Sequence, residues 1–293
     1  MDGVLILDKP QGISSHDAVR EIRRLCGIKR VGHLGTLDPL ATGVLPLVVG
    51  RTTRLAQFFL AHDRAYEAEI RFGYATDTYD ARGERVSEPA DVELSADQIE
   101  ALLKDFRGRF AQTPPPVSAK KVGGVPAYKF ARKKQPVRLE PVEIEVYEFS
   151  LLAVEGSLAR VRVRCSAGTY VRSLAHDLGR RLGTGAHVES LRRMAMGAFT
   201  IEGAHTLAEL EVLRSENRLD EAFVEAEKVL PEMPVERVDE ATAALIQHGR
   251  DFRVSAFGNG RGAKRVKAVD PQGRLIAIGE ARLPLVYHPI VVL

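Results

Sequence analysis

The sequence predicts an α+β fold in two parts, a mixed domain over residues 1–230 and a small β-rich domain over residues 235–293. A length of 293 residues allows about two domains. Strand-like and helix-like patterns alternate over most of the chain, whereas short strands and turns follow "LPEMP" at residues 230–234. A hydrophobic content of 45% and a charged content of 28% are ordinary for a chain that buries a sizeable core.

The periodicity of apolar residues predicts the elements of the larger part. Strands are expected at residues 4–7, 43–50, 65–73 and 158–165, and helices after Ser14 or Ser15, at 51–62, after Ser95, at 169–183 and in two stretches between 207 and 230. Ser95 and Gln98 have the spacing of a capping box. In "LARVRVRC" at residues 158–165, Val and Cys alternate with Arg, which predicts a half-buried strand with a cationic face.

Two further segments have distinct compositions. Residues 113–136 hold five prolines and many cations, so we expect an exposed projection with one short helix around Tyr128. Residues 265–281 predict a hairpin whose turn spans residues 270–273.

Charge is distributed unevenly along the chain. Residues 101–140 carry ten Lys and Arg against two Asp and Glu, a balance of +8, and residues 246–293 carry eight against three, a balance of +5. Residues 201–240 carry four against twelve, a balance of −8. Cationic stretches separated by an acidic one are typical of a surface that binds a polyanion, although charge alone leaves solvated faces as an equal alternative.

Several classes of protein are disfavoured. Cys26 and Cys165 lie far apart and are expected to be reduced thiols in a cytoplasmic protein. The start "MDGVLILDKPQG" does not resemble a signal peptide, and no apolar run approaches the roughly 20 residues of a membrane span. No Walker loop, GxGxxG motif, Gly-x-Ser-x-Gly elbow or metal-ligand spacing occurs, so we expect neither a metal nor an organic cofactor.

The stretch "RVGHLGTLDPLATGVLPLVVG" at residues 30–50 places one carboxylate, Asp38, between apolar runs. Before a proline, an aspartate is most simply a turn residue. Gly32, Gly35 and Gly43 allow a backbone or ligand to approach closely, which favours a functional loop. The sequence offers no convincing second carboxylate for a glycosidase pair. The chemistry that remains needs one carboxylate, as nucleophile or base, and a cation that holds it ionised.

Six stretches, in this order across about residues 3–200, closely resemble the motifs of TruB-type tRNA pseudouridine-55 synthases: "LDKPQGISSHDAV", "GHLGTLDPLATGVLPL", "YEAEIRFGYATDTYDARG", "PPPVSAKKVGGVPAYKFAR", "CSAGTYVRSLAHDLG" and "GAHVESLRR". The resemblance implies a mixed-sheet pseudouridine synthase catalytic domain with an RNA-gripping insertion at about residues 112–138. Looser similarity in "GRDFRV" and "VKAVDPQGRLIAIGEA" implies that residues 235–293 form a PUA-like RNA-binding domain, with a packing module as the alternative.

The resemblance also implies a reaction. The chain would isomerise uridine to pseudouridine at position 55 in the T-loop of tRNA, after flipping the base out of its stack. Asp38 would be the catalytic aspartate, whether it adds to the base, attacks the sugar or removes a sugar proton. Arg172 would support Asp38. The residues implied to bind the flipped nucleotide are His33, Tyr66, Tyr170 and Leu191, although His33, Tyr66 and Leu191 would otherwise be interpreted as structural.

The insertion supplies the implied contacts to the RNA backbone, Lys120, Lys121, Lys133 and Lys134. It departs from the family pattern at Val117, where an aromatic residue is common, and at Lys120, where an apolar one is usual. The expected partner is tRNA, with no membrane and no obligatory protein partner. One alternative, a guide-RNA-dependent synthase of the dyskerin type, is disfavoured by the long cationic insertion. The other, a non-catalytic RNA chaperone, is disfavoured because Asp38, Tyr66 and Arg172 are all present.

Overall fold

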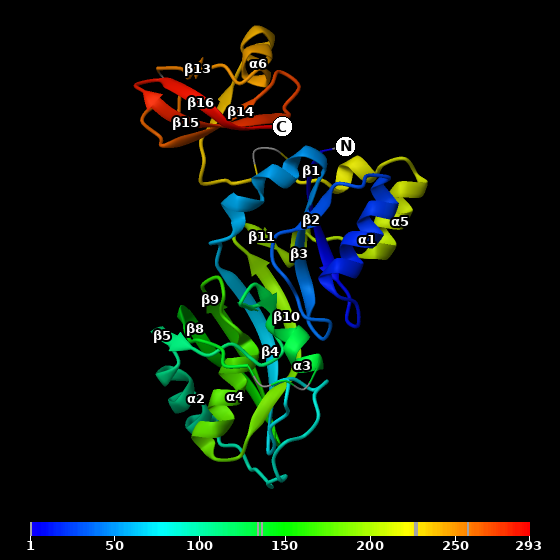
Figure 1. The fold of residues 1–293 in the computed structure, drawn as a ribbon, viewed down its shortest axis with the longest axis vertical. Coiled ribbons are helices and arrows are strands. Elements are labelled where there is room, and N and C mark those ends of the chain that lie inside the picture. Colours follow the sequence, from blue (N-terminus) through cyan, green and yellow to red (C-terminus); the bar gives the residue numbers. More distant parts are fainter. Residues whose placement is uncertain (1, 134, 136, 226–227, 257) are drawn as a thin grey trace.

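A computed structural model describes residues 2–133, 135, 137–225, 228–256 and 258–293 (Figure 1). The fold is mixed α and β, as the sequence predicts. Within the described residues, a nine-stranded sheet forms the larger part, a five-stranded sheet forms the C-terminal part, and a two-stranded hairpin lies in the insertion. None of the described helices is long and apolar enough to cross a lipid bilayer.

The strands of the large sheet lie in one continuous row, with two short strands beside it. Its order is β1 (Gly3–Lys9), β3 (Thr42–Val49), β10 (Ala186–Met196), β4 (Arg64–Phe72), β9 (Leu158–Cys165), β8 (Val142–Glu155) and β5 (Gly108–Gln112), with β2 (Val31–His33) beside β3 and β11 (Phe199–Thr200) beside β10. All of these pairs are antiparallel except β10 with β3. The loop that joins β2 to β3 ends at Thr42, which pairs with Arg192 of β10 where the two halves of the sheet meet.

Helices cover the sheet at both ends (Figure 1). They are α1 (Ser15–Cys26), α2 (Ala96–Asp105), α4 (Val171–Leu182) and α5 (Leu207–Ser215), with 3₁₀ segments η1 (Gly50–Phe59), η2 (Ile201–Gly203) and η3 (Leu219–Ala222). Apolar residues of all four helices pack with inward-facing strand residues in one continuous core. Burial of this apolar surface is the main term that fixes α4, which carries Arg172, against the sheet.

Local sequence signals explain where several of these helices begin and end and which strand residues are buried. Ser14 caps α1 in a reciprocal capping box with Asp17, and Gly183 ends α4 in the left-handed region at φ 72°. In β9 the valines and Cys165 are fully buried while the arginines between them are exposed, as the alternation predicts. The short helix around Tyr128 is α3 (Ala127–Arg132). Cys26 and Cys165 are both buried and form no disulfide.

Three local predictions are wrong. The segment after Gly50 is a 3₁₀ helix, because the hydroxyls of Thr52 and Thr53 bond to carbonyls three residues back, at 2.7 and 2.9 Å, and compete with α-helical pairing. Ser95 starts α2 without a side-chain hydrogen bond, since it is exposed and water can satisfy the helix end. The second helical stretch after residue 207 is the 3₁₀ turn η3.

The C-terminal sheet has the order β12 (Val235–Arg237), β14 (Arg265–Val269), β15 (Leu275–Leu283), β16 (Val286–Val292) and β13 (Phe252–Arg253), and α6 (Glu240–Gln247) packs beside it. The predicted hairpin is β14 with β15, and Asp270 in its turn accepts from the backbone N–H of Arg274 at 2.8 Å. A second apolar cluster continues from β1 and β3 through Leu230 to Val291, so the two sheets share buried contacts.

Candidate active site

The loop that carries Asp38 is held from the β1–α1 segment. The backbone N–H of Gly12 donates to the Pro39 carbonyl at 2.7 Å. The buried Ser15 hydroxyl donates to the Leu37 carbonyl at 3.0 Å and accepts from the Leu37 N–H at 2.8 Å. The residues on both sides of Asp38 are thereby fixed, which limits the directions that its carboxylate can take.

Arg193 holds the same loop from β10. Its side chain is completely buried, and its guanidinium donates to the Val44 carbonyl at 2.6 Å and to the Gly35 carbonyl at 3.1 Å. Gly43 lies so close that a Cβ there would be 2.2 Å from the Arg193 carbonyl oxygen, and its φ is +96°. Glycine is therefore required at position 43 for the loop to approach β10.

Arg172 brings the start of α4 against the loop. Its Nε lies 2.9 Å from Asp38 Oδ2 in an ion pair. Its two terminal nitrogens donate to the carbonyls of Thr78 and Val117, each at 2.9 Å. The Arg172 side chain is 4% exposed and that of Asp38 is 37% exposed. Arg172 is thus no solvated helix cation but a buried guanidinium whose orientation is set by three groups from separate segments.

Asp80 is a second carboxylate beside Arg172. It is buried, its Oδ2 lies 3.7 Å from an Arg172 terminal nitrogen, and its Oδ1 accepts from the Thr78 hydroxyl at 2.7 Å and from the Arg82 N–H at 3.1 Å. The sequence alone assigns no role to Asp80, although it lies in the stretch "ATDTYDARG". The observable signal is an aspartate among hydroxyl residues, which predicts local turn bonding but not a distant arginine.

Asp38 is less shielded than its apolar sequence neighbours suggest. Its flanking residues Leu37, Leu40 and Ala41 are buried, whereas its own side chain is 37% exposed. The apolar residues point into the core, and the carboxylate faces outward beside Arg172. Water is therefore excluded from Asp38 only when another molecule lies over it.

Tyr66 and Leu191 lie on the paired strands β4 and β10. Tyr66 is paired with Arg193 across the two strands and is 7% exposed, and Leu191 is 8% exposed. Burial raises the pKa of the Tyr66 phenol, so it stays neutral at pH 7. Both side chains belong to the main core and can present only a small area to a ligand.

Tyr170 immediately precedes α4, two residues before Arg172. The amide of the buried Gln112 accepts from the Tyr170 N–H at 2.8 Å and donates to its carbonyl at 3.1 Å. Burial raises the pKa of the Tyr170 phenol, while the nearby charges of Arg172 and Asp38 act on it in opposite directions. Tyr170 therefore lies in the electrostatic neighbourhood of Asp38 and is neutral at pH 7.

His33 ends β2, at the start of the Asp38 loop. Its ring packs edge-to-face on His16 with centroids 5.6 Å apart. Burial, the nearby His16 and Arg193 lower the pKa of His33, so the imidazole is neutral at pH 7.

Lys9 is a buried cation close to Asp38. It is fully buried, and its ammonium donates to the carbonyls of Pro10 and Ile13 at 2.8 and 2.9 Å. Burial lowers the pKa of Lys9 from 10.5 to about 8, although the Asp38 charge opposes this shift. The sequence does not single out Lys9, because a lysine within an apolar strand gives no sign of what it faces.

The Lys9 shift predicts a pH-dependent stability. Between pH 8 and 10.5 the unfolded lysine holds a proton that the folded one has lost, so the contribution of Lys9 to the free energy of unfolding rises with pH in that window. Between pH 8 and pH 10, urea unfolding should show a more positive change in the free energy of unfolding in the wild type than in Lys9→Met, because the buried Cys165 thiol, whose pKa is raised to about 11, contributes the opposite trend to both proteins. The matched control is Lys104→Met, at an exposed lysine. Equal pH dependence in Lys9→Met and the wild type would contradict the assignment.

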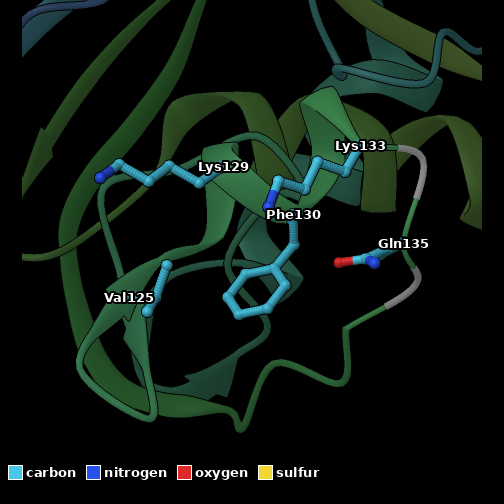
Figure 2. A pocket seen from close by; sticks show the side chains of 5 residues that line it. All are labelled: Val125, Lys129, Phe130, Lys133 and Gln135. Carbon is cyan, nitrogen blue, oxygen red and sulfur yellow. The ribbon is translucent and has the colours of Figure 1, made fainter.

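The insertion is rooted at the active site. Val117 accepts from Arg172, and the carbonyl of Thr113 accepts from the hydroxyl of Ser173 at 2.8 Å. Beyond this root, β6 (Lys121–Val122) pairs with β7 (Val125–Pro126), and a cavity of about 260 Å³ is lined by Val125, Lys129, Phe130, Lys133 and Gln135 (Figure 2). The exposed lysines of this region are Lys120, Lys121, Lys129 and Lys133, and Lys134 lies outside the described residues. The insertion therefore joins a cationic surface to the Arg172 site.

Comparison with solved structures gives the same fold. The crystal structure of the archaeal box H/ACA sRNP Nop10-Cbf5 complex contains a chain that matches 99% of this chain with a TM-score of 0.71 and 26% identity, over 85% of its own length. A structure of an H/ACA RNP bound to a substrate RNA containing 2'-deoxyuridine matches 99% of this chain with a TM-score of 0.71 and 27% identity, over 84% of its own length.

Sequence comparison is more specific. Residues 23–171 match the model of the TruB family pseudouridylate synthase N-terminal domain, and residues 172–238 match that of the tRNA pseudouridylate synthase B C-terminal domain. The chain is 55% identical to a tRNA pseudouridine synthase B from Solibacter usitatus over 100% of both chains. It is 42% identical to one from Stutzerimonas stutzeri, over 96% of this chain and 92% of the relative. The chain therefore belongs to the TruB family of pseudouridine synthases and is an RNA-modifying isomerase.

Proposed function

We propose that the chain converts the uridine at position 55 of the tRNA T-loop to pseudouridine, with Asp38 as the catalytic group. The observation that carries this proposal is the partly exposed Asp38 carboxylate, which lies in a loop held on both sides and is paired at 2.9 Å with the buried Arg172. Isomerisation breaks the bond between N1 of the uracil and the sugar, and forms a bond from C5 of the uracil to the same sugar carbon. One proton moves from C5 to N1. No atom is gained or lost, so the reaction consumes no second reactant. One positioned carboxylate is therefore sufficient as its catalytic group.

Each chemical role open to Asp38 requires the anion. Addition to the base, attack on the sugar and removal of a sugar proton all use an ionised carboxylate. When a flipped uridine covers Asp38, water leaves and the neighbouring guanidinium must stabilise the anion. Arg172 is suited to this because its remaining nitrogens already donate to carbonyls and Asp38 is its outward-facing partner.

We propose that the space occupied by the flipped nucleotide is lined by Tyr66, Leu191, Tyr170 and His33. Tyr66 and Leu191 would present an apolar floor, and Tyr170 and His33 would present neutral polar edges. Neutral rings suit a neutral uracil, because no fixed charge competes with the ion pair. We propose that the described C-terminal sheet is the PUA-like RNA-binding domain and that residues 1–230 are the catalytic domain.

We propose that tRNA is recognised directly, without a guide RNA. The chain shares 55% identity over its full length with a relative named tRNA pseudouridine synthase B, but 26% with the H/ACA chain. The test incubates purified chain alone with an unmodified tRNA transcript and maps pseudouridine by position. We expect modification of the T-loop uridine and none in a transcript with cytidine there. Product formed only after a guide RNA or further proteins are added would contradict the proposal.

The insertion lysines should contribute to affinity rather than to chemistry. Changing Lys120, Lys121 and Lys133 together to Gln should weaken tRNA binding and lower the logarithmic salt slope by about 0.7 to 0.9 for each phosphate that the variant no longer neutralises. The measurement is tRNA affinity at several salt concentrations, with single-turnover rate at saturating protein. Lys104→Gln, outside the insertion, is the control. An unchanged slope in the triple variant would remove these lysines from the RNA interface.

A further inference from the structure

Tyr79 has an unusual backbone conformation beside the Arg172 site. Its φ is +64°, in the left-handed region that glycine enters readily and a bulky side chain rarely does. Tyr79 lies between Thr78 and Asp80, the two residues of its segment that contact Arg172. Some interaction must therefore compensate for this conformation.

That interaction is a ring stack with α4. The rings of Tyr79 and His176 lie with centroids 3.7 Å apart and planes at 9°. His176 follows Arg172 by four residues, so both project from one face of α4. Within the described residues, the buried Nδ1 of His176 has no hydrogen-bond partner, and burial lowers the pKa of the imidazole. The ring is thus a neutral stacking surface.

The backbone of the same segment is tied to β10. The Val188 N–H donates to the Tyr79 carbonyl at 3.0 Å, and the Ala81 N–H donates to the Val188 carbonyl at 2.8 Å. These bonds fix the segment relative to the sheet, whereas the Tyr79–His176 stack fixes it relative to α4. Arg172 lies where the two constraints meet.

We propose that Tyr79 and His176 are a positioning pair for catalysis. Their stack holds the Thr78 carbonyl and the Asp80 carboxylate in register with α4, and so sets the direction in which Arg172 presents its Nε to Asp38. Neither ring is assigned a contact with RNA. The inference rests on the proposed function of Asp38 and adds a layer of residues behind Arg172.

The test removes each half of the stack. Tyr79→Gly tolerates the positive φ, and His176→Ala leaves α4 with a good helix former. Each should lower the single-turnover rate about tenfold, with tRNA affinity within about twofold of wild type, and the double variant should lose little more than either single one because the rings act as a unit. His176→Phe, which keeps a flat ring, should restore most of the rate. Tyr74→Ala is the control, since Tyr74 contacts His187 instead.

Each outcome decides the inference. Wild-type rates in Tyr79→Gly and His176→Ala overturn it, as do equal losses of rate in Tyr74→Ala, a loss confined to affinity, or failure of His176→Phe to recover activity. If thermal unfolding shows that His176→Ala does not fold, Tyr79→Gly and His176→Phe give the answer. A wild-type chain that forms no pseudouridine would instead refute the proposed function, and the two failures are therefore distinguishable.

Discussion

Asp38→Asn should abolish pseudouridine formation while leaving tRNA binding intact. The amide fills the same space but can neither act as a nucleophile nor accept a proton as the carboxylate does. A loss of 10⁴-fold or more, on the order of 5.5 kcal/mol in the barrier, fits a covalent or proton-transfer role. Binding should persist, because the substitution removes a negative charge that faces RNA.

The measurement is single-turnover product formation with saturating protein, beside tRNA affinity at one fixed salt concentration. Asp97→Asn, at an exposed carboxylate in the first turn of α2, is the matched control and should behave as wild type. If Asp38 were only a turn residue before Pro39, Asn would serve nearly as well and the rate would fall little. Near-normal turnover would reject the catalytic assignment.

Arg172→Lys should cost on the order of 100-fold in single-turnover rate, about 2.7 kcal/mol, although the charge is kept. The planar guanidinium contacts Asp38 and the carbonyls of Thr78 and Val117 at once. One ammonium group cannot reproduce this fork, so a buried carbonyl would be left without its donor or Asp38 without its partner.

Arg180→Lys gives the matched control, because Arg180 lies on the same helix with its side chain 73% exposed. Circular dichroism should verify that Arg172→Lys is folded before rates are compared. Wild-type turnover in a folded Arg172→Lys protein would mean that the position needs only a positive charge, and the positioning of Asp38 would need another explanation.

The sequence predicts those features that depend on nearby residues. The alternation in β9, the capping box of α1 and the glycine that ends α4 each follow from a few neighbours, and the structure has all three. The family motifs likewise mark Asp38 and Arg172 as residues of one site. Their separation of 134 positions shows that this came from resemblance, since no local pattern joins them.

The features of the site that the sequence does not predict depend on long-range packing. Asp80, Lys9 and Ser15 all contact or approach the Asp38 site, yet each lies in a stretch whose local pattern predicts only a turn, a strand or a cap. Sheet formation and the docking of α4 bring these stretches together. The exposure of Asp38 was also unpredictable, because apolar neighbours in sequence say nothing about which way one side chain of a loop points.

Position-resolved pseudouridine analysis of a single tRNA transcript tests whether Asp38 is the group that converts the uridine at position 55. Wild-type chain and Asp38→Asn would each be incubated with the transcript in parallel, without other proteins or RNAs. We predict near-stoichiometric pseudouridine at position 55 with the wild type and none at any position with Asp38→Asn, at protein concentrations where both bind the RNA. Pseudouridine at position 55 from the variant would refute the catalytic role of Asp38, and modification by the wild type only at other positions would refute the proposed target.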